Sequence, residues 1–147
     1  MSLGDHFPAD VKKASAVRNI APGMIIKLEV IMNDGKLHKK RFVIVHVDEI
    51  TVVCVINSEL HPLILNNPSA LRCQVIIDSK NHPFMNRDFH IDCSKVWNYQ
   101  TTAVIESISD RPEWALGLIK ATLRDQVVAS LKFAPQIAPT DTAVYCA

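Results

Sequence analysis

The chain has 147 residues, of which 48% are hydrophobic and 21% are charged, and its formal net charge is +1. This length and composition predict one globular domain with a continuous hydrophobic core. The near-neutral charge excludes binding to nucleic acid or membrane through overall basicity, so such binding needs a local cluster of charge.

Residues 1–21 are predicted to form an N-terminal extension with a short helix over residues 10–20, for which Asp10 is the expected N-cap. Beyond Pro22-Gly23, every second residue as far as Val30 is apolar, and polar residues stand between several of them. This period of two predicts a half-buried strand.

A hairpin is predicted immediately after this strand. Asp34-Gly35 supplies the two positive-φ positions that a tight hairpin turn needs. Residues 37–47 are therefore expected to pair back antiparallel. One face of this second strand is expected to carry Phe42, Ile44 and His46, and the other Val43, Val45 and Val47.

The middle of the chain continues as short strands. Residues 50–56 are almost all β-branched, which predicts a central strand buried on both faces. Residues 57–69 are rich in Asn, Ser and Pro and predict a loop. Residues 71–77 alternate again, residues 84–97 have mixed character, and residues 103–108 are predicted to form the last short strand.

The end of the chain is predicted to be helical. Asp110 stands three residues before Glu113, and apolar residues then recur every three or four positions, which predicts an amphipathic helix over residues 110–133. Residues 134–147 are expected to be an extended tail. The region 22–133 is thus predicted to be a mainly β, α+β domain: a curled antiparallel sheet or small barrel with a C-terminal helix.

The four cysteines form no C-x-x-C pair and stand far apart, at Cys54, Cys73, Cys93 and Cys146. Reduced thiols and a cytoplasmic location are therefore expected. No apolar run approaches the ~20 residues of a membrane span, and the N-terminus has no apolar signal-peptide segment, so no membrane association is expected.

With these elements placed, the chain resembles the MazF/PemK family of toxin endoribonucleases. The likeness covers roughly residues 22–133 and is carried by the order and spacing of four stretches. These are Pro22-Gly23-Met24-Ile25-Ile26, Lys40-Arg41-Phe42-Val43-Ile44-Val45, Val55-Ile56-Asn57-Ser58 and Asp92-Cys93-Ser94-Lys95-Val96.

The resemblance implies an SH3-like barrel that binds single-stranded RNA and cleaves it without a metal or other cofactor. Carried over by position, the catalytic arginine is Arg41 and the catalytic hydroxyl is Ser58. The resemblance also implies a homodimer and an antitoxin protein as partner. Two positions depart from the family pattern, because no proline follows Arg41 and Met24 stands where an acid is usual.

A run of basic residues beside the hairpin turn agrees with an RNA ligand. A fixed guanidinium stabilises charge that develops on phosphorus, and lysine or histidine contacts the backbone or moves a proton. Asn57 is a further RNA-binding candidate beside Ser58. The alternative is a solvated hairpin that uses charge to protect an edge strand. The run comprises Lys36, His38, Lys39, Lys40 and Arg41.

Residues 87–94 concentrate polar side chains in one segment, yet their spacing does not match paired zinc ligands. Asp92 is better explained as the cap of a turn and Cys93 as a core residue. A second hypothesis for the whole chain follows from its two departures from the family pattern and from its near-neutral charge. It is a non-catalytic barrel that binds a protein partner, including a CcdB-like gyrase binder, because a shared fold does not settle function.

Overall fold

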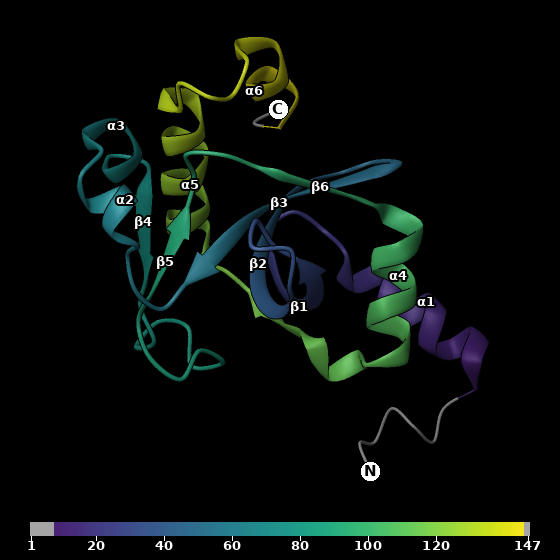
Figure 1. The fold of residues 1–147 in the computed structure, drawn as a ribbon. Helices are drawn as coiled ribbons and strands as arrows, with labels where there is room; N and C mark the ends of the chain where they lie inside the picture. The colour runs from purple at the N-terminus through teal and green to yellow at the C-terminus, as the bar shows by residue number, and fades with distance from the viewer. Residues whose placement is uncertain (1–7, 146–147) are drawn as a thin grey trace.

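The computed structural model describes residues 8–145, in which seven antiparallel strands curl into a half-barrel flanked by helices (Figure 1). This confirms the predicted α+β class with a curled antiparallel sheet and a C-terminal helix. The strands are β1 (Met24–Ile31), β2 (Leu37–Val47), β3 (Ile50–Asn57), β4 (Gln74–Ile77), β5 (Phe89–Asp92), β6 (Trp97–Gln100) and β7 (Ala115–Leu118). The helices are α1 (Ala9–Asn19), α2 (Pro62–Leu65), α3 (Pro68–Leu71), α4 (Thr101–Asp110), α5 (Ala121–Phe133) and α6 (Pro139–Tyr145).

The sheet is organised around β3, as its apolar sequence predicted. The strand order is β4-β5-β3-β2-β1-β7, and β6 also pairs with β3. Strand β6 pairs with the first half of β3, whereas β5 pairs with its last two residues. The residues from Thr51 to Ile56 are all buried, which explains why this strand carries almost no polar side chains.

The hairpin between β1 and β2 is confirmed, but its turn is not the predicted two-residue turn. The Met32 carbonyl accepts a hydrogen bond from the Gly35 N–H at 2.9 Å, and the Met32 N–H donates to the Lys36 carbonyl at 3.1 Å. Gly35 has a φ of 75°, and no non-glycine residue of the described chain has a positive φ. Asp34 therefore stays out of the left-handed region, and Gly35 alone closes a longer turn.

Two hydrophobic cores lie on opposite faces of the sheet. Val43 packs in the core that α5 covers, and Phe42 packs in the core that α1 and α4 cover. A bulge shifts the β2–β3 register between Ile44 and His46. Because a bulge reverses the alternation of faces beyond it, Val47 packs on the α1–α4 side, and its predicted place beside Val43 is wrong.

Residues 103–108, predicted as the last strand, lie instead in helix α4. Val104 and Ile108 stand four residues apart and are both buried in the core with α1. This is the spacing of one helix face. The short apolar run was compatible with either structure, and packing against α1 selects the helix.

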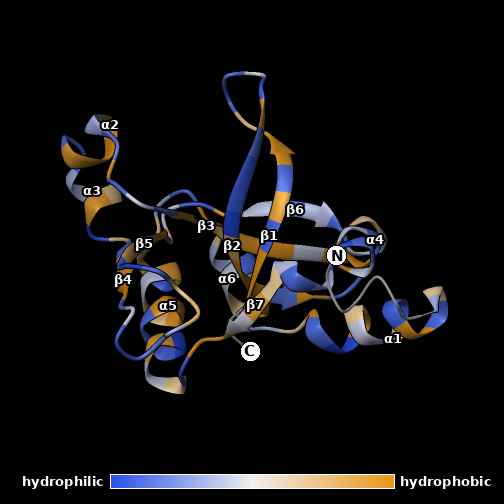
Figure 2. Cartoon of the chain, turned by 90° about the horizontal axis from the view of Figure 1, so that it is seen from below, coloured by the Kyte–Doolittle hydropathy of each residue, from blue (hydrophilic) through white to orange (hydrophobic). Residues whose placement is uncertain are grey.

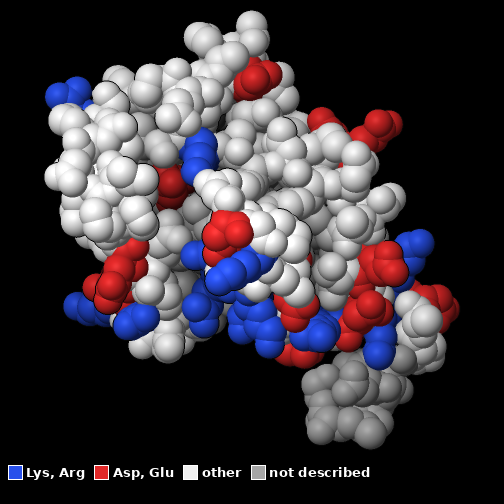
Figure 3. Space-filling model, viewed as in Figure 1, with Lys and Arg blue, Asp and Glu red and all other residues white. Residues whose placement is uncertain are grey.

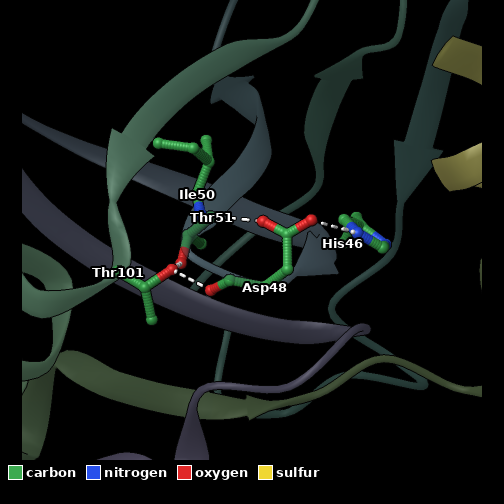
Figure 4. Close-up of polar contacts among 5 residues, drawn as sticks. All are labelled: His46, Asp48, Ile50, Thr51 and Thr101. Carbon is green, nitrogen blue, oxygen red and sulfur yellow. Dashed lines mark hydrogen bonds and ion pairs between the residues drawn. The ribbon is translucent and has the colours of Figure 1, made fainter.

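A chain of hydrogen bonds attaches the start of α4 to the turn between β2 and β3 (Figure 4). The Thr101 hydroxyl donates to the Asp48 carbonyl at 2.6 Å. With that proton used, the fully buried Thr51 hydroxyl donates to the Thr101 oxygen, 2.8 Å away. The Asp48 carboxylate accepts from the Ile50 N–H at 2.8 Å and lies 3.1 Å from the His46 ring nitrogen.

The single helix predicted for residues 110–133 is wrong in its first part. Pro112–Trp114 form a 3₁₀ turn and β7 pairs with β1, so the helix α5 begins only at Ala121. The predicted apolar face is confirmed within α5, where Leu123, Val127 and Leu131 are buried.

The ends of the chain and the loop after β3 also hold short helices. Helix α1 is confirmed, but it starts after Pro8, so Asp10 lies in its first turn and does not cap it. The predicted loop over residues 57–69 includes α2 and the start of α3, and the predicted extended tail includes α6. None of the helices in residues 8–145 has the length and apolar character that a membrane crossing requires.

Cys54, Cys73 and Cys93 are buried free cysteines, as predicted. Burial is the main reason that the pKa of Cys73 is raised above its usual value. Cys146 lies outside the described residues.

Candidate functional site

Two adjoining cavities open between the β1–β2 hairpin and the α2–α3 segment. The larger measures about 660 Å³ and the smaller about 370 Å³. Lys40 and His61 line both cavities, so we treat them as one feature, the Lys40 groove. Figure 2 shows the outer half of the hairpin extending away from the rest of the sheet, with a hydrophilic β2.

The pairing of β2 with β3 brings three predicted residues together in the smaller cavity. Arg41 pairs with Ile56, which sets Lys40 beside Asn57. The Lys40 ammonium donates to the Asn57 side-chain oxygen at 3.2 Å. Ser58 follows β3 directly and lines the same cavity. A cation, an amide and a hydroxyl thus share one exposed site.

Arg41 points to the opposite face of β2 from Lys40, because consecutive residues of a strand alternate between faces. Its guanidinium lies 5.1 Å from the centre of the Phe89 ring, and Arg87 lies 5.5 Å from the same ring. Phe89 is buried in the α5 core. Arg41 lines neither cavity of the groove.

His38 lies on the same face of β2 as Lys40 and lines the larger cavity. Its Nε2 lies 2.8 Å from the Asp34 carboxylate, whose other oxygen accepts from the Lys36 N–H at 2.9 Å. These two hydrogen bonds, the one from Lys36 first, hold the pKa of Asp34 below its usual value. With Nε2 facing the carboxylate, the Nδ1 atom of a neutral His38 ring is left as a proton acceptor.

The remaining predicted residues, Lys36 and Lys39, are exposed and line neither cavity. In the space-filling view, Lys and Arg gather across the lower middle of the face, where the hairpin points towards the viewer, with carboxylates among them (Figure 3). The basic run is therefore divided by strand alternation, and His38 and Lys40 are the two members that line the groove.

His61 is a groove residue that the sequence analysis missed. Its Nδ1 accepts a hydrogen bond from the Leu63 N–H at 3.1 Å, so the ring caps helix α2. The neutral ring then carries its proton on Nε2. The available signal was Pro62, because proline favours the first position of a helix and so marks its predecessor as the cap.

Asp92, Ser94 and Lys95 line the larger cavity from the other side. Asp92 is 3% exposed, and its Oδ1 accepts from the Gln74 amide at 2.9 Å and from the Ser94 N–H at 3.0 Å and hydroxyl at 2.5 Å. The predicted turn-capping role of Asp92 and the core position of Cys93 are thereby confirmed.

Within residues 8–145, no group of three or more His, Cys, Asp or Glu side chains is placed to hold a metal ion. No family model matches this chain, and no curated protein matches it.

Proposed function

We propose that the protein binds single-stranded RNA in the Lys40 groove. The observation that carries this proposal is the position of Lys40, which lines both cavities and is hydrogen-bonded to Asn57. A lysine between two cavities is suited to a phosphate, with space for a nucleoside on either side. The larger cavity is within the usual size range of small-molecule sites. Bases of an unpaired strand are free to enter such cavities, whereas those of a duplex are stacked.

The resemblance to the MazF/PemK family extends the proposal to metal-free cleavage of this RNA, in the cytoplasm, by a homodimer that an antitoxin protein neutralises. Of the two catalytic residues that the resemblance implies, Ser58 lines the groove and Arg41 does not. Arg41 packs on Phe89 and is not a lining residue, whereas His38 lines the groove together with Lys40. We therefore assign the proton acceptor to His38 and the phosphate contact to Lys40.

Replacing Lys40 and its neighbour Lys39 in turn tests the binding site. The change is the same in Lys40→Ala and Lys39→Ala, but only Lys40 lines the groove. Fluorescence anisotropy with a labelled RNA oligonucleotide at several salt concentrations measures both affinity and salt dependence. We expect Lys40→Ala to weaken binding severalfold and to reduce the salt slope by about 1, as the loss of one phosphate contact does.

Lys39→Ala is expected to retain nearly the wild-type affinity and slope. Equal losses in the two variants would contradict a phosphate site at Lys40 and would indicate diffuse attraction by the whole hairpin. Wild-type protein that binds no RNA at any salt concentration would remove the proposal.

A second candidate, a non-catalytic barrel that binds a protein segment, is favoured by exposed apolar side chains on α2 and on the β1–β2 hairpin. Leu63 and Leu65 of α2 are 76% and 54% exposed, and the cross-strand pair Ile31 and Leu37 is 62% and 60% exposed. Contiguous exposed apolar residues often mark protein interfaces. A photo-crosslinking residue at position 63 should then give a discrete protein adduct in cells, absent when the same residue replaces Leu118 of β7, which is 59% exposed.

A further inference from the structure

Only one of the two oxygens of the Asp92 carboxylate accepts hydrogen bonds from the protein. Its Oδ1 accepts three hydrogen bonds, from Gln74 and from two groups of Ser94. Its Oδ2 accepts none from the described residues, and none of their cationic side chains forms an ion pair with it. Oδ2 is not among the fully enclosed side-chain atoms that lack a partner, so it keeps some exposure and is left as an acceptor for a ligand.

The position of Asp92 directs this acceptor to the Lys40 groove. Ile91 and Cys93, on either side of Asp92, both belong to the α5 core. Alternation along the strand places Asp92 on the other face, where it lines the larger cavity. The charged and titratable groups that line this cavity with it are Asp34, His38, Lys40, His61 and Lys95.

Two neighbours, Gln74 and Ser94, hold the carboxylate in a fixed orientation through three hydrogen bonds. Gln74 is the cross-strand partner of Asp92, and its amide also donates to the Ala70 carbonyl at 3.1 Å, which anchors it to the end of α3. Ser94 binds through both its backbone and its hydroxyl. A rigid, buried acceptor in a cavity discriminates between ligands by their donors, because a ligand that lacks the donor leaves the carboxylate unpaired.

We propose that Asp92 reads a base of the bound RNA and makes the Lys40 groove prefer an exocyclic amino group, so that cytosine binds better than uracil. This inference rests on the proposed binding of single-stranded RNA. Cytosine and uracil have nearly the same shape, but cytosine presents an N4 amino donor where uracil presents an O4 acceptor. The donor satisfies Asp92 Oδ2, whereas the acceptor is repelled by it. Lys40, in the same cavity, contacts the phosphate.

Octamers of cytidine and of uridine, labelled with the same fluorophore, test the proposal on the wild-type protein. We expect the cytidine octamer to bind about tenfold tighter, in line with the value of one base-specific hydrogen-bonding contact. Equal affinities would overturn the inference and leave RNA binding intact. Failure of both octamers and of mixed-sequence RNA to bind would overturn the proposed function itself, so the two failures are distinguishable.

The Asp92→Asn variant separates base recognition from a structural role. Asn keeps a carbonyl oxygen for Gln74 and Ser94, and it places an NH₂ donor where Oδ2 stood. The preference should therefore fall or reverse towards uridine, a change that loss of packing does not produce. The matched control is Asp88→Asn, since Asp88 is exposed and accepts from the Ser79 N–H outside the groove. An unchanged preference in folded Asp92→Asn protein, checked by circular dichroism, would overturn the role of Asp92.

Discussion

Strand β2 and its turns hold two Asp–His pairs, and they differ in what they face. His38 contacts Asp34 at 2.8 Å and lines the Lys40 groove, whereas His46 contacts Asp48 at 3.1 Å outside it. In each pair the carboxylate orients the ring. If the 2′-hydroxyl of RNA attacks the neighbouring phosphorus, His38 Nδ1 takes the hydroxyl proton. The 5′-oxygen then leaves with a proton from water, and a cyclic phosphate remains.

His38→Ala is therefore expected to slow RNA cleavage in EDTA by about 100-fold or more, the usual contribution of a general base. His46→Ala is expected to cleave at the wild-type rate. Gel analysis of labelled RNA measures both rates, and 2′-deoxy substrate controls for the attacking hydroxyl. Equal rates in the two variants would exclude His38 as the base. Intact RNA with wild-type protein would remove cleavage from the proposed function while leaving binding open.

At the scale of residues, part of the groove was predictable from the sequence. Lys40 and Asn57 meet because the hairpin and β3 pair in register, and both were predicted as RNA contacts. Arg41 was grouped with Lys40 because they are adjacent in sequence, yet a period of two separates them. His61 was missed although Pro62 marks it as the cap of a helix. Asp92 was predicted as a cap but not as a groove residue, because its bond to Gln74 joins residues distant in sequence.

At the scale of elements, Thr101 attaches α4 to the β2–β3 turn through its backbone N–H, which donates to the Glu49 carbonyl at 3.0 Å, and through its hydroxyl. Thr101 donates to the Asp48 carbonyl and accepts from the buried Thr51 hydroxyl. Thr101→Val removes both contacts and leaves a buried donor unpaired. We expect it to lower the free energy of unfolding by about 1–2 kcal/mol, the typical cost of an unsatisfied buried group.

Thr51→Val is the matched control, because it removes the buried donor and leaves the bond from Thr101 to Asp48 intact. We expect a smaller loss from it. The double variant should be more stable than the sum of the single losses predicts, since no donor is then stranded. Urea denaturation of the wild type, the two single variants and the double variant measures this coupling. Strictly additive losses would show that the two hydroxyls act independently.

The elements that the sequence predicted correctly are those whose local pattern agrees with their packing. The hairpin and β3 were predicted because alternation, turn residues and β-branched side chains all indicate strands there. Residues 103–118 were misassigned because their apolar spacing fits two structures. Val104 and Ile108 form a helix face against α1, and the short β7 forms only because β1 offers a free edge. Such choices depend on contacts distant in sequence.

At the scale of the whole molecule, the turns at the two ends of β2 are each stabilised by an aspartate carboxylate. Hydrogen bonds lower the pKa of Asp34, from Lys36 first and then His38, and that of Asp48, from the Ile50 N–H first and then His46. A carboxyl group whose pKa is lower in the folded state binds fewer protons than in the unfolded state. The stabilisation that such a group contributes is complete above its pKa in the unfolded state, near 3.8. It is lost as the pH falls through the lower pKa of the folded state.

We therefore expect the melting temperature to fall when the pH is lowered from about 5 to about 3, and Asp34→Asn with Asp48→Asn to make this fall shallower. The asparagines keep the oxygen that accepts from the backbone but carry no proton-dependent charge. Thermal melts across this pH range measure the slope. The control is Asp125→Asn, an exposed carboxylate of α5, which should leave the slope unchanged. If the melting temperature of the double variant has the same pH dependence as that of the wild type, protonation of other groups causes the loss of stability in acid, and Asp34 and Asp48 do not.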